Sequence, residues 1–255
     1  FVRRVHRFLE SATSLWYRPE VLGVEHLSDR ASLVVSTHNG GFWMPDVYTL
    51  LVAFWRRFGP ETPLHGLMHS FALRLPVLGR LWRKLGAIPA HPDCARMAFE
   101  ADRPVLVCPG GDVDALKPWR RRHEVSFGER RGFVRTALRH RVPIVPVVSV
   151  GAHEVFFVLN DGRRWAEATG FARVFRVKSV PFAFGLPFGI TPAGFFNLPF
   201  PSKVVQRVLP PIAFDEPPEA AGDPAVVERC FERIRAEMQA ALDELAARRR
   251  WPILG

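Results

Sequence analysis

The pattern of hydrophobic and polar positions divides much of the chain into short strands and amphipathic helices. Short segments rich in Val, Ile and Phe are typical of buried strands. They cover residues 21–24, 32–36, 105–108, 144–150, 154–159 and 204–209. Between several of them, apolar residues recur at helical spacing, near 45–57, 70–85, 92–101 and 130–140. This alternation predicts an α/β fold in one domain, with a mostly parallel central sheet flanked by helices.

Both ends of the chain carry helical patterns. Residues 1–18 place apolar residues on one side and arginines on the other, so this helix either lies on a membrane or packs on the core with its basic side in solvent. Near the other end, Asp223 can cap a helix whose first turn holds Pro224. We therefore expect an N-terminal amphipathic helix over 1–20 and a single domain over 21–255.

Composition and charge narrow the class of protein. Of the 255 residues, 48% are hydrophobic, which fits a globular enzyme and excludes a disordered chain. The net charge of +10 points to an anionic partner: nucleic acid, a membrane surface or a phosphorylated substrate. Arginine supplies most of this charge and binds phosphate well, although a GC-rich genome produces the same bias. The three cysteines are far apart and form no disulfide framework, and no run is typical of a transmembrane helix.

Residues 180–201 form an unusual segment without a charged residue. It contains six phenylalanines, and its five prolines and three glycines prevent a continuous helix. The segment either lines an apolar tunnel, or dips into a membrane interface, or is an ordinary buried loop. We favour the first two, because the number of aromatic residues exceeds what packing of a loop requires.

Two motifs at predicted strand ends are candidates for chemistry. The apolar run over 32–36 leads to His38, and Asp46 follows after two glycines, an arrangement from which a general base can be built. The strand over 105–108 leads to Pro109-Gly110-Gly111, where backbone N–H groups can face an oxyanion, although this tripeptide is also a common turn. The phosphate-binding and nucleophilic-serine motifs GxxxxGK[ST], GxGxxG and GxSxG do not occur.

Other charged groups give weaker signals. Arginines gather downstream of the second motif and suit either phosphate binding or a solvated face. His65 and His69 have the spacing of metal ligands on a helix, but the glutamate of an HExxH motif is missing and we expect no metal site. Nucleic acid is not an expected partner, because no recognised module is present and the aromatic residues cluster apart from the arginines.

Taken in order, the motifs resemble the glycerolipid acyltransferases of the lysophospholipid acyltransferase superfamily, especially the monoacylglycerol acyltransferase-like branch. The matching blocks are Val21-Leu-Gly-Val-Glu-His-Leu, Ser36-Thr-His38 through Asp46, Leu85-Gly-Ala-Ile-Pro-Ala with the helix from Ala95, Pro109-Gly-Gly, and Val142-Pro-Ile-Val-Pro-Val147. Two departures stand out. Seven residues separate His38 from Asp46, more than in the common family block, and Gly110 replaces the glutamate usual after the proline.

The resemblance implies a fold like that of the glycerol-phosphate acyltransferases and transfer of an acyl group from acyl-CoA or acyl-carrier protein to a hydroxyl of a glycerolipid or lysophospholipid. The thioester is a co-substrate, and no cofactor is implied. His38 would be the general base and Asp46 its partner, and the amides of Gly110 and Gly111 would hold the oxyanion. Substrate-binding residues would be Asp112, Asp114, Lys117, Arg130 and Arg131. The acyl chain or the membrane would contact Phe182, Phe184, Phe188, Phe195 and Phe196.

Such a protein is expected on the cytoplasmic face of a bacterial membrane, held peripherally by an anionic lipid surface. Its expected partners are the lipid acceptor and acyl-CoA, with no obligate protein partner. The alternative is a catalytically silent lipid-binding or scaffold protein on the same fold, which the long spacing between His38 and Asp46 favours.

Overall fold

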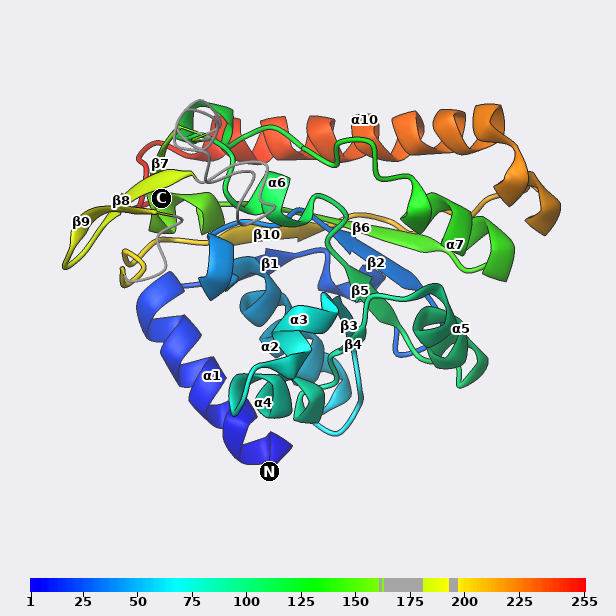
Figure 1. The fold of residues 1–255 in the computed structure, drawn as a ribbon, viewed down its shortest axis with the longest axis horizontal. Helices are drawn as coiled ribbons and strands as arrows, with labels where there is room; N and C mark the ends of the chain where they lie inside the picture. The colour runs from blue at the N-terminus through cyan, green and yellow to red at the C-terminus, as the bar shows by residue number, and fades with distance from the viewer. Residues whose placement is uncertain (161, 163–180, 193–196) are drawn as a thin grey trace.

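The computed structural model describes residues 1–160, 162, 181–192 and 197–255, and within them a central sheet runs in the order β1-β10-β6-β2-β5-β3-β4 (Figure 1). Its strands are β1 (Glu20–Leu22), β2 (Leu33–Ser36), β3 (His65–Met68), β4 (Ile88–Pro89), β5 (Val105–Val107), β6 (Ile144–Val150) and β10 (Val205–Val208). From β6 to β4 neighbouring strands are parallel, whereas β10 is antiparallel to β6 and parallel to β1. The predicted α/β fold with a mostly parallel sheet is confirmed.

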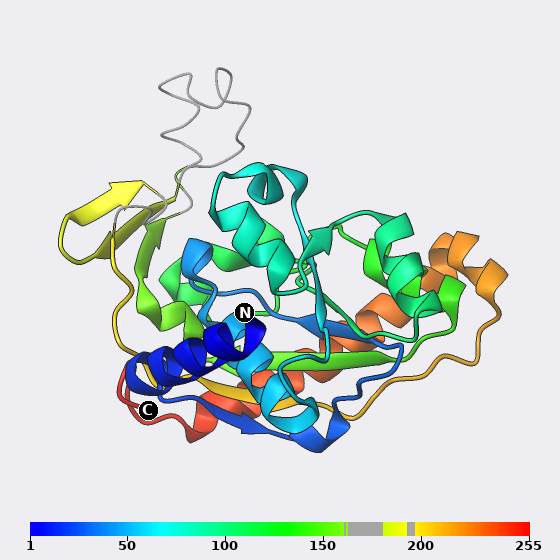
Figure 2. The same cartoon turned by 90° about the horizontal axis from the view of Figure 1, so that it is seen from below.

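Helices cover both faces of this sheet (Figures 1 and 2). One face carries α1 (Val2–Tyr17), α2 (Pro45–Phe58), α3 (Ser70–Arg74) and α4 (Leu78–Lys84). The other carries α5 (Pro92–Glu100), α7 (Gly132–His140) and α10 (Pro224–Arg248). The connections include α6 (Gly111–Ala115) and the 3-10 turns η1 (Val24–His26), η2 (Gly41–Trp43), η3 (Trp119–Arg121), η4 (Ala152–Val155) and η5 (Pro218–Gly222).

The central strands β2 and β6 are buried along their whole length. Side chains of β2 alternate between two cores: Leu33 and Val35 belong to the core under α7 and α10, and Val34 to the core under α2. Their almost uninterrupted apolar sequence fits parallel strands covered on both faces. Because β2 pairs in parallel with β5 and with β6, the residues that follow β2 and β5 emerge at one edge of the sheet.

Two helix predictions have different outcomes. The C-terminal helix begins as predicted, with the Asp223 carboxylate accepting a hydrogen bond of 2.8 Å from the Ala225 N–H. The single helix over 70–85 is wrong, because the chain breaks into α3 and α4. Pro76 disfavours a helical conformation at Leu75, and the following residue, Val77, has a φ of 61°.

The N-terminal helix α1 packs against α2 through part of its apolar side. Val2, Val5 and Leu9 join the core under α2. Phe8 and Leu15 remain exposed. Across the described residues, no helix combines the length and the hydropathy needed to span a bilayer.

A second, three-stranded antiparallel sheet projects from one end of the molecule (Figure 2). Its strands are β7 (Phe157–Asn160), β8 (Phe182–Gly185) and β9 (Gly189–Pro192). The hairpin of β8 and β9 occupies part of the charge-free segment 180–201, so the interpretation of this part as a buried loop is wrong. Phe184, Leu186, Phe188 and Ile190 are all more than 40% exposed. Phe195 and Phe196 lie outside the described residues.

Candidate active site

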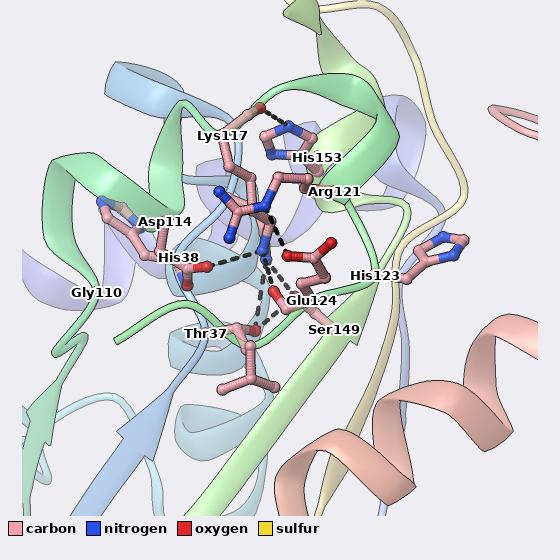
Figure 3. A network of polar contacts seen from close by, with 12 residues as sticks. Thr37, His38, Gly110, Asp114, Lys117, Arg121, His123, Glu124, Ser149 and His153 are labelled. Atoms are coloured by element: carbon pink, nitrogen blue, oxygen red, sulfur yellow. Dashed lines mark hydrogen bonds and ion pairs between the residues drawn. The ribbon is translucent and has the colours of Figure 1, made fainter. Parts of the chain in front are cut away.

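His38 lies two residues beyond the end of β2, where the loops that follow β2, β5 and β6 come together (Figure 3). The Pro109-Gly110-Gly111 turn follows β5 and leads into α6. Ser149 lies near the end of β6 and contributes its hydroxyl to the same region. The sheet thus brings together motifs that are far apart in the sequence, which is the usual location of ligand sites in parallel sheets.

The seven residues between His38 and Asp46 fold into a compact loop that returns Asp46 to the histidine. Gly40 has a φ of 74°, and a Cβ atom there would lie 2.5 Å from Pro45 Cδ, so only glycine allows the chain to close in this way. Asp46 then enters the first turn of α2. The seven intervening residues therefore leave the Asp46 carboxylate close to the His38 ring.

The His38 and Asp46 side chains are close but do not form a hydrogen bond. Nδ1 of His38 lies 3.9 Å from Oδ1 of Asp46. Asp46 is completely buried, whereas the His38 side chain retains 15% exposure. His38 Nδ1 is buried without a hydrogen-bond partner in the described part of the chain. The predicted proximity of the pair is therefore present, and the direct hydrogen bond is not made in this state.

Asp46 is held by groups that the sequence did not reveal. Its Oδ1 accepts the Val47 N–H at 2.9 Å, and its Oδ2 accepts Asn39 Nδ2 at 3.2 Å. Gln206, buried on β10, donates to the Asp46 carbonyl at 3.0 Å. Asn39 adjoins His38, and Gln206 lies between Val205 and Arg207 on β10. Both polar residues can be seen in the sequence. Their spacing along the chain does not indicate that either of them contacts Asp46.

The glycine turn after β5 has one amide already in use. The Gly111 N–H donates to the Cys108 carbonyl at 3.1 Å, so its predicted role in holding an oxyanion does not fit this structure. Gly110 is required for a different reason: a Cβ atom there would lie 2.3 Å from the Asp114 Cβ. Arg130 closes the turn from outside, donating to the carbonyls of Pro109 and Gly110 at 3.0 and 2.7 Å.

The five residues predicted to bind substrate divide into three groups. Asp112 and Arg130 form an exposed ion pair of 2.7 Å at the glycine turn. Arg131 faces α10, where it pairs with Glu228 and stacks on a phenylalanine ring 3.4 Å from its guanidinium carbon. The structure therefore does not bring Arg131 to His38.

Asp114 and Lys117 are buried and bonded to each other at 2.7 Å, with exposures of 0% and 3%. Their charged groups contact protein atoms and are turned away from solvent, so direct substrate binding by this pair is not what the structure shows. Asp114 Oδ2 instead accepts the backbone N–H of His38 at 2.7 Å (Figure 3). The pair belongs to the framework around the histidine.

Cys108 lies beside both carboxylates at the end of β5. Burial raises the pKa of the Cys108 thiol well above its usual range, and the charges of Asp46 and Asp114 raise it further. A thiol in this state is a poor nucleophile. The site consequently favours base catalysis by the histidine over a covalent intermediate on the cysteine.

An apolar cavity of about 60 Å³ adjoins the start of α2. Met44, Val47 and Tyr48 form one side, and Trp82 closes another by donating to the Tyr48 hydroxyl at 2.9 Å. Burial raises the pKa of the Tyr48 phenol, which stays protonated. The cavity is suited to alkyl groups and begins next to Asp46.

Three of the five predicted phenylalanine contacts lie on the projecting hairpin, and Phe195 and Phe196 lie outside the described residues. Phe184 and Phe188 are exposed there, and Phe182 is half-buried. The segment after the hairpin connects to the site, because Trp43 Nε1 donates to the Asn197 carbonyl at 3.1 Å. The hairpin is therefore tied to the loop between His38 and Asp46.

The two histidines with helical metal-ligand spacing are not on a helix. His65 is on β3, and His69 caps α3 by accepting the Phe71 N–H. Among the residues with described positions, no group of three metal-ligating side chains is found.

Comparisons with known proteins bear on the family and the fold of the chain. The family model described as diacylglycerol acyltransferase matches residues 62–212, more than half of the chain. This range includes the glycine turn and β6, whereas His38 and Asp46 precede it. Human diacylglycerol O-acyltransferase 2 is 28% identical over 101 residues, which cover 37% of this chain and 26% of that protein.

Longer matches involve proteins without a known activity. An uncharacterized protein of Mycobacterium tuberculosis is 33% identical over 92% of this chain, and one of Mycobacterium leprae is 29% identical over 96%. The chain spans 63% and 65% of the length of these relatives.

The fold resembles that of the 1-acyl-sn-glycerophosphate acyltransferase PlsC from Thermotoga maritima. The TM-score is 0.60 at 17% identity, covering 98% of this chain and 81% of the other. The glycerolipid acyltransferase fold expected from the sequence is thus confirmed, and with the match over 62–212 the chain belongs to the diacylglycerol acyltransferase family.

Proposed function

We propose that the protein transfers an acyl group from a thioester, acyl-CoA or acyl-carrier protein, to the hydroxyl of a glycerolipid or lysophospholipid, with His38 as the general base. The observation that carries this proposal is the partly exposed His38 imidazole at a strand end, backed by the buried Asp46 carboxylate at 3.9 Å. A base needs access to the proton it removes and a partner for its charged form.

In the proposed reaction, His38 Nε2 removes the proton from the acceptor hydroxyl, because Nδ1 is the buried ring nitrogen. The acceptor oxygen attacks the thioester carbonyl, and the Gly110 amide is the remaining candidate to stabilise the oxyanion. The intermediate expels the thiolate, which takes the proton back from the imidazolium. Asp46 stabilises the imidazolium, and a small adjustment of the ring closes the distance to a hydrogen bond.

The apolar cavity beside Asp46 supports an acyl substrate. Its walls include Leu51, Leu64 and Leu85 from three separate segments, and none of the residues lining it carries a charge. Burying methylene groups there would contribute binding free energy of about 0.8 kcal/mol each.

The function is tested by incubating the purified protein with labelled acyl-CoA and a panel of acceptors: lysophosphatidic acid, another lysophospholipid, a monoacylglycerol and a diacylglycerol. Product masses identify the acceptor. His38→Ala is expected to lower transfer by about 10²–10⁴, with the melting temperature nearly unchanged. A folded alanine variant with wild-type activity would contradict the assignment of the base.

The second candidate is a catalytically silent lipid-binding or scaffold protein, favoured by the missing hydrogen bond between His38 and Asp46. The same assay separates the two functions, because a silent protein binds the acyl lipid without turnover in either the wild type or the alanine variant.

We also propose peripheral attachment to the cytoplasmic face of a bacterial membrane. Three exposed apolar elements support it: Leu15 and Trp16 on α1, the β8–β9 hairpin, and Trp251 near the C-terminal end of the chain. Trp16 Nε1 donates to the Pro199 carbonyl, which joins α1 to the segment after the hairpin. Tryptophans favour the interface between lipid and water, and the net charge of +10 favours anionic lipid.

A further inference from the structure

The ion pair of Asp114 and Lys117 is buried immediately behind the candidate base. Their side-chain exposures are 0% and 2%, and Oδ1 lies 2.7 Å from Nζ. Burying both charges removes their hydration, a cost that a packed apolar pair would avoid. The position and the hydrogen bonds of the pair indicate a role in the arrangement of the site.

Asp114 uses its two oxygens for different segments. Oδ1 accepts Lys117 Nζ, and Oδ2 accepts the backbone N–H of His38 at 2.7 Å. Lys117 Nζ also donates to the Glu124 carbonyl at 2.6 Å, and His153 Nε2 donates to the Lys117 carbonyl at 2.7 Å (Figure 3). Loops after β2, β5 and β6 are therefore joined in one hydrogen-bonded network.

The His38 imidazole depends on this backbone anchor. Its Nδ1 has no hydrogen-bond partner among the described residues, so no side-chain bond to that atom fixes the ring. The carboxylate of Asp114 holds the backbone from which the ring projects, and the absence of a side chain at Gly110 leaves room for Asp114. A charge-assisted hydrogen bond of this kind is short and directional.

We propose that Asp114 is a positioning residue for His38, and that Lys117 holds the Asp114 carboxylate in the orientation that accepts the His38 N–H. This inference rests on the proposed function of His38 as a base. It replaces the direct contact with substrate expected for both residues from the sequence.

Two double variants separate positioning from charge burial. Asp114→Asn with Lys117→Met removes both charges but keeps an oxygen that can accept the His38 N–H. Asp114→Ala with Lys117→Met removes the charges and the acceptor together. Arg96→Met with Glu100→Gln is the matched control, since it removes an exposed ion pair on α5.

We expect the alanine double variant to have a kcat at least tenfold below that of the asparagine double variant, with the KM for both substrates within about twofold. The control should retain wild-type kinetics. Rates are compared per folded molecule, from the amplitude of the thermal transition. Equal kcat values in the two double variants would overturn the proposal, because loss of the acceptor would then have no effect on the base.

A second measurement does not depend on catalysis. In the protein labelled with ¹⁵N-histidine, the His38 amide is the resonance lost in His38→Ala. We expect its proton to be shifted downfield and to exchange slowly, and to exchange at least tenfold faster in the alanine double variant. A rapidly exchanging His38 amide in the wild type overturns the proposal even where the alanine variant does not fold.

The two readouts distinguish the two hypotheses. If the His38 amide is protected but the protein transfers no acyl group, the hydrogen bond to Asp114 stands and the proposed function is rejected. An active enzyme whose His38 amide exchanges rapidly would reject the hydrogen bond to Asp114 as an anchor, and the proposed acyl transfer would stand.

Discussion

Nδ1 of His38 lies 3.9 Å from Oδ1 of Asp46, beyond hydrogen-bond reach but close enough for a small rotation of the ring to make the bond. The carboxylate cannot move toward the histidine as easily, because it is buried and accepts hydrogen bonds on both oxygens. The imidazole, which retains 15% exposure, is therefore the side chain that we expect to move. Catalytic hydrogen bonds often tighten in this way once substrate is bound.

Asp46→Asn is expected to lower kcat about 100-fold and to destabilise the fold by about 1–3 kcal/mol. The asparagine side chain has one oxygen, so either the Val47 N–H or Asn39 Nδ2 loses its acceptor. The negative charge that would stabilise the imidazolium is also lost. Acyl-transfer kinetics and urea unfolding measure the two effects.

Asp93→Asn is the matched control for that variant, because Asp93 also follows a proline at the start of a helix but is 67% exposed. It should leave activity at the wild-type value and change stability by less than about 1 kcal/mol. Similar losses in both variants would show that the helix start, and not the site, accounts for the effect.

Gly40→Ala tests whether the loop between His38 and Asp46 has to close as observed. Its positive φ costs an alanine about 1–2 kcal/mol, and the added Cβ would also lie 2.5 Å from Pro45 Cδ. Gly128→Ala shares a positive φ of 58° but meets no atom within 4 Å. We expect a larger loss of stability and a lower kcat only at Gly40. If the two variants lose the same stability and the same kcat in unfolding and kinetic assays, the contact with Pro45 does not determine the closure of the loop.

His153 gives the fold a defined pH dependence. Burial, reinforced by the charge of Lys117, lowers the pKa of His153 to about 3. The unfolded chain therefore takes up a proton near pH 6.5 while the folded protein does not, so this group stabilises the fold fully above that pH and less as the pH falls toward 3. The slope is at most about 1.4 kcal/mol per pH unit.

His153→Gln retains a donor for the Lys117 carbonyl and has no titrating ring. Urea unfolding at pH 7 and pH 5 should show a loss of stability in the wild type larger by about 2 kcal/mol than in the variant. Parallel pH dependences for the two proteins would mean that the folded protein takes up a proton on the ring as readily as the unfolded chain does.

The sequence predicted the parts of the fold whose environment is uniform. β2 and β6 are buried on both faces, and their runs of Val and Ile are typical of such strands. The strand β3 was missed, because its sequence His65-Gly-Leu-Met is neither alternating nor uniformly apolar. The β8–β9 hairpin was missed because its strands are short and contain or adjoin glycines and prolines, which are uncommon in strands.

The site shows the same division. His38 and Asp46 could be selected from their order along the chain. Gln206 could not, because it reaches the Asp46 carbonyl only through the antiparallel register that sets it opposite Ser149. Asp114 was predicted from the sequence as a substrate-binding residue. Its burial, and hence its bond to the His38 backbone, could not be predicted, because it follows from how three strand ends converge.

The exposed face of the β8–β9 hairpin should determine membrane affinity. Phe188 is 67% exposed in its turn, and inserting its ring into the lipid interface is worth about 1.5–3 kcal/mol, or roughly 10–100-fold in partitioning. Phe188→Glu should therefore weaken binding to vesicles containing anionic lipid by at least about tenfold in a sedimentation assay. Met97→Glu is the control, since Met97 is 62% exposed on α5, at the other end of the molecule in Figure 1. It changes the charge by the same amount, so equal losses in both variants would mean that net charge alone directs the protein to the membrane and that the hairpin does not enter it.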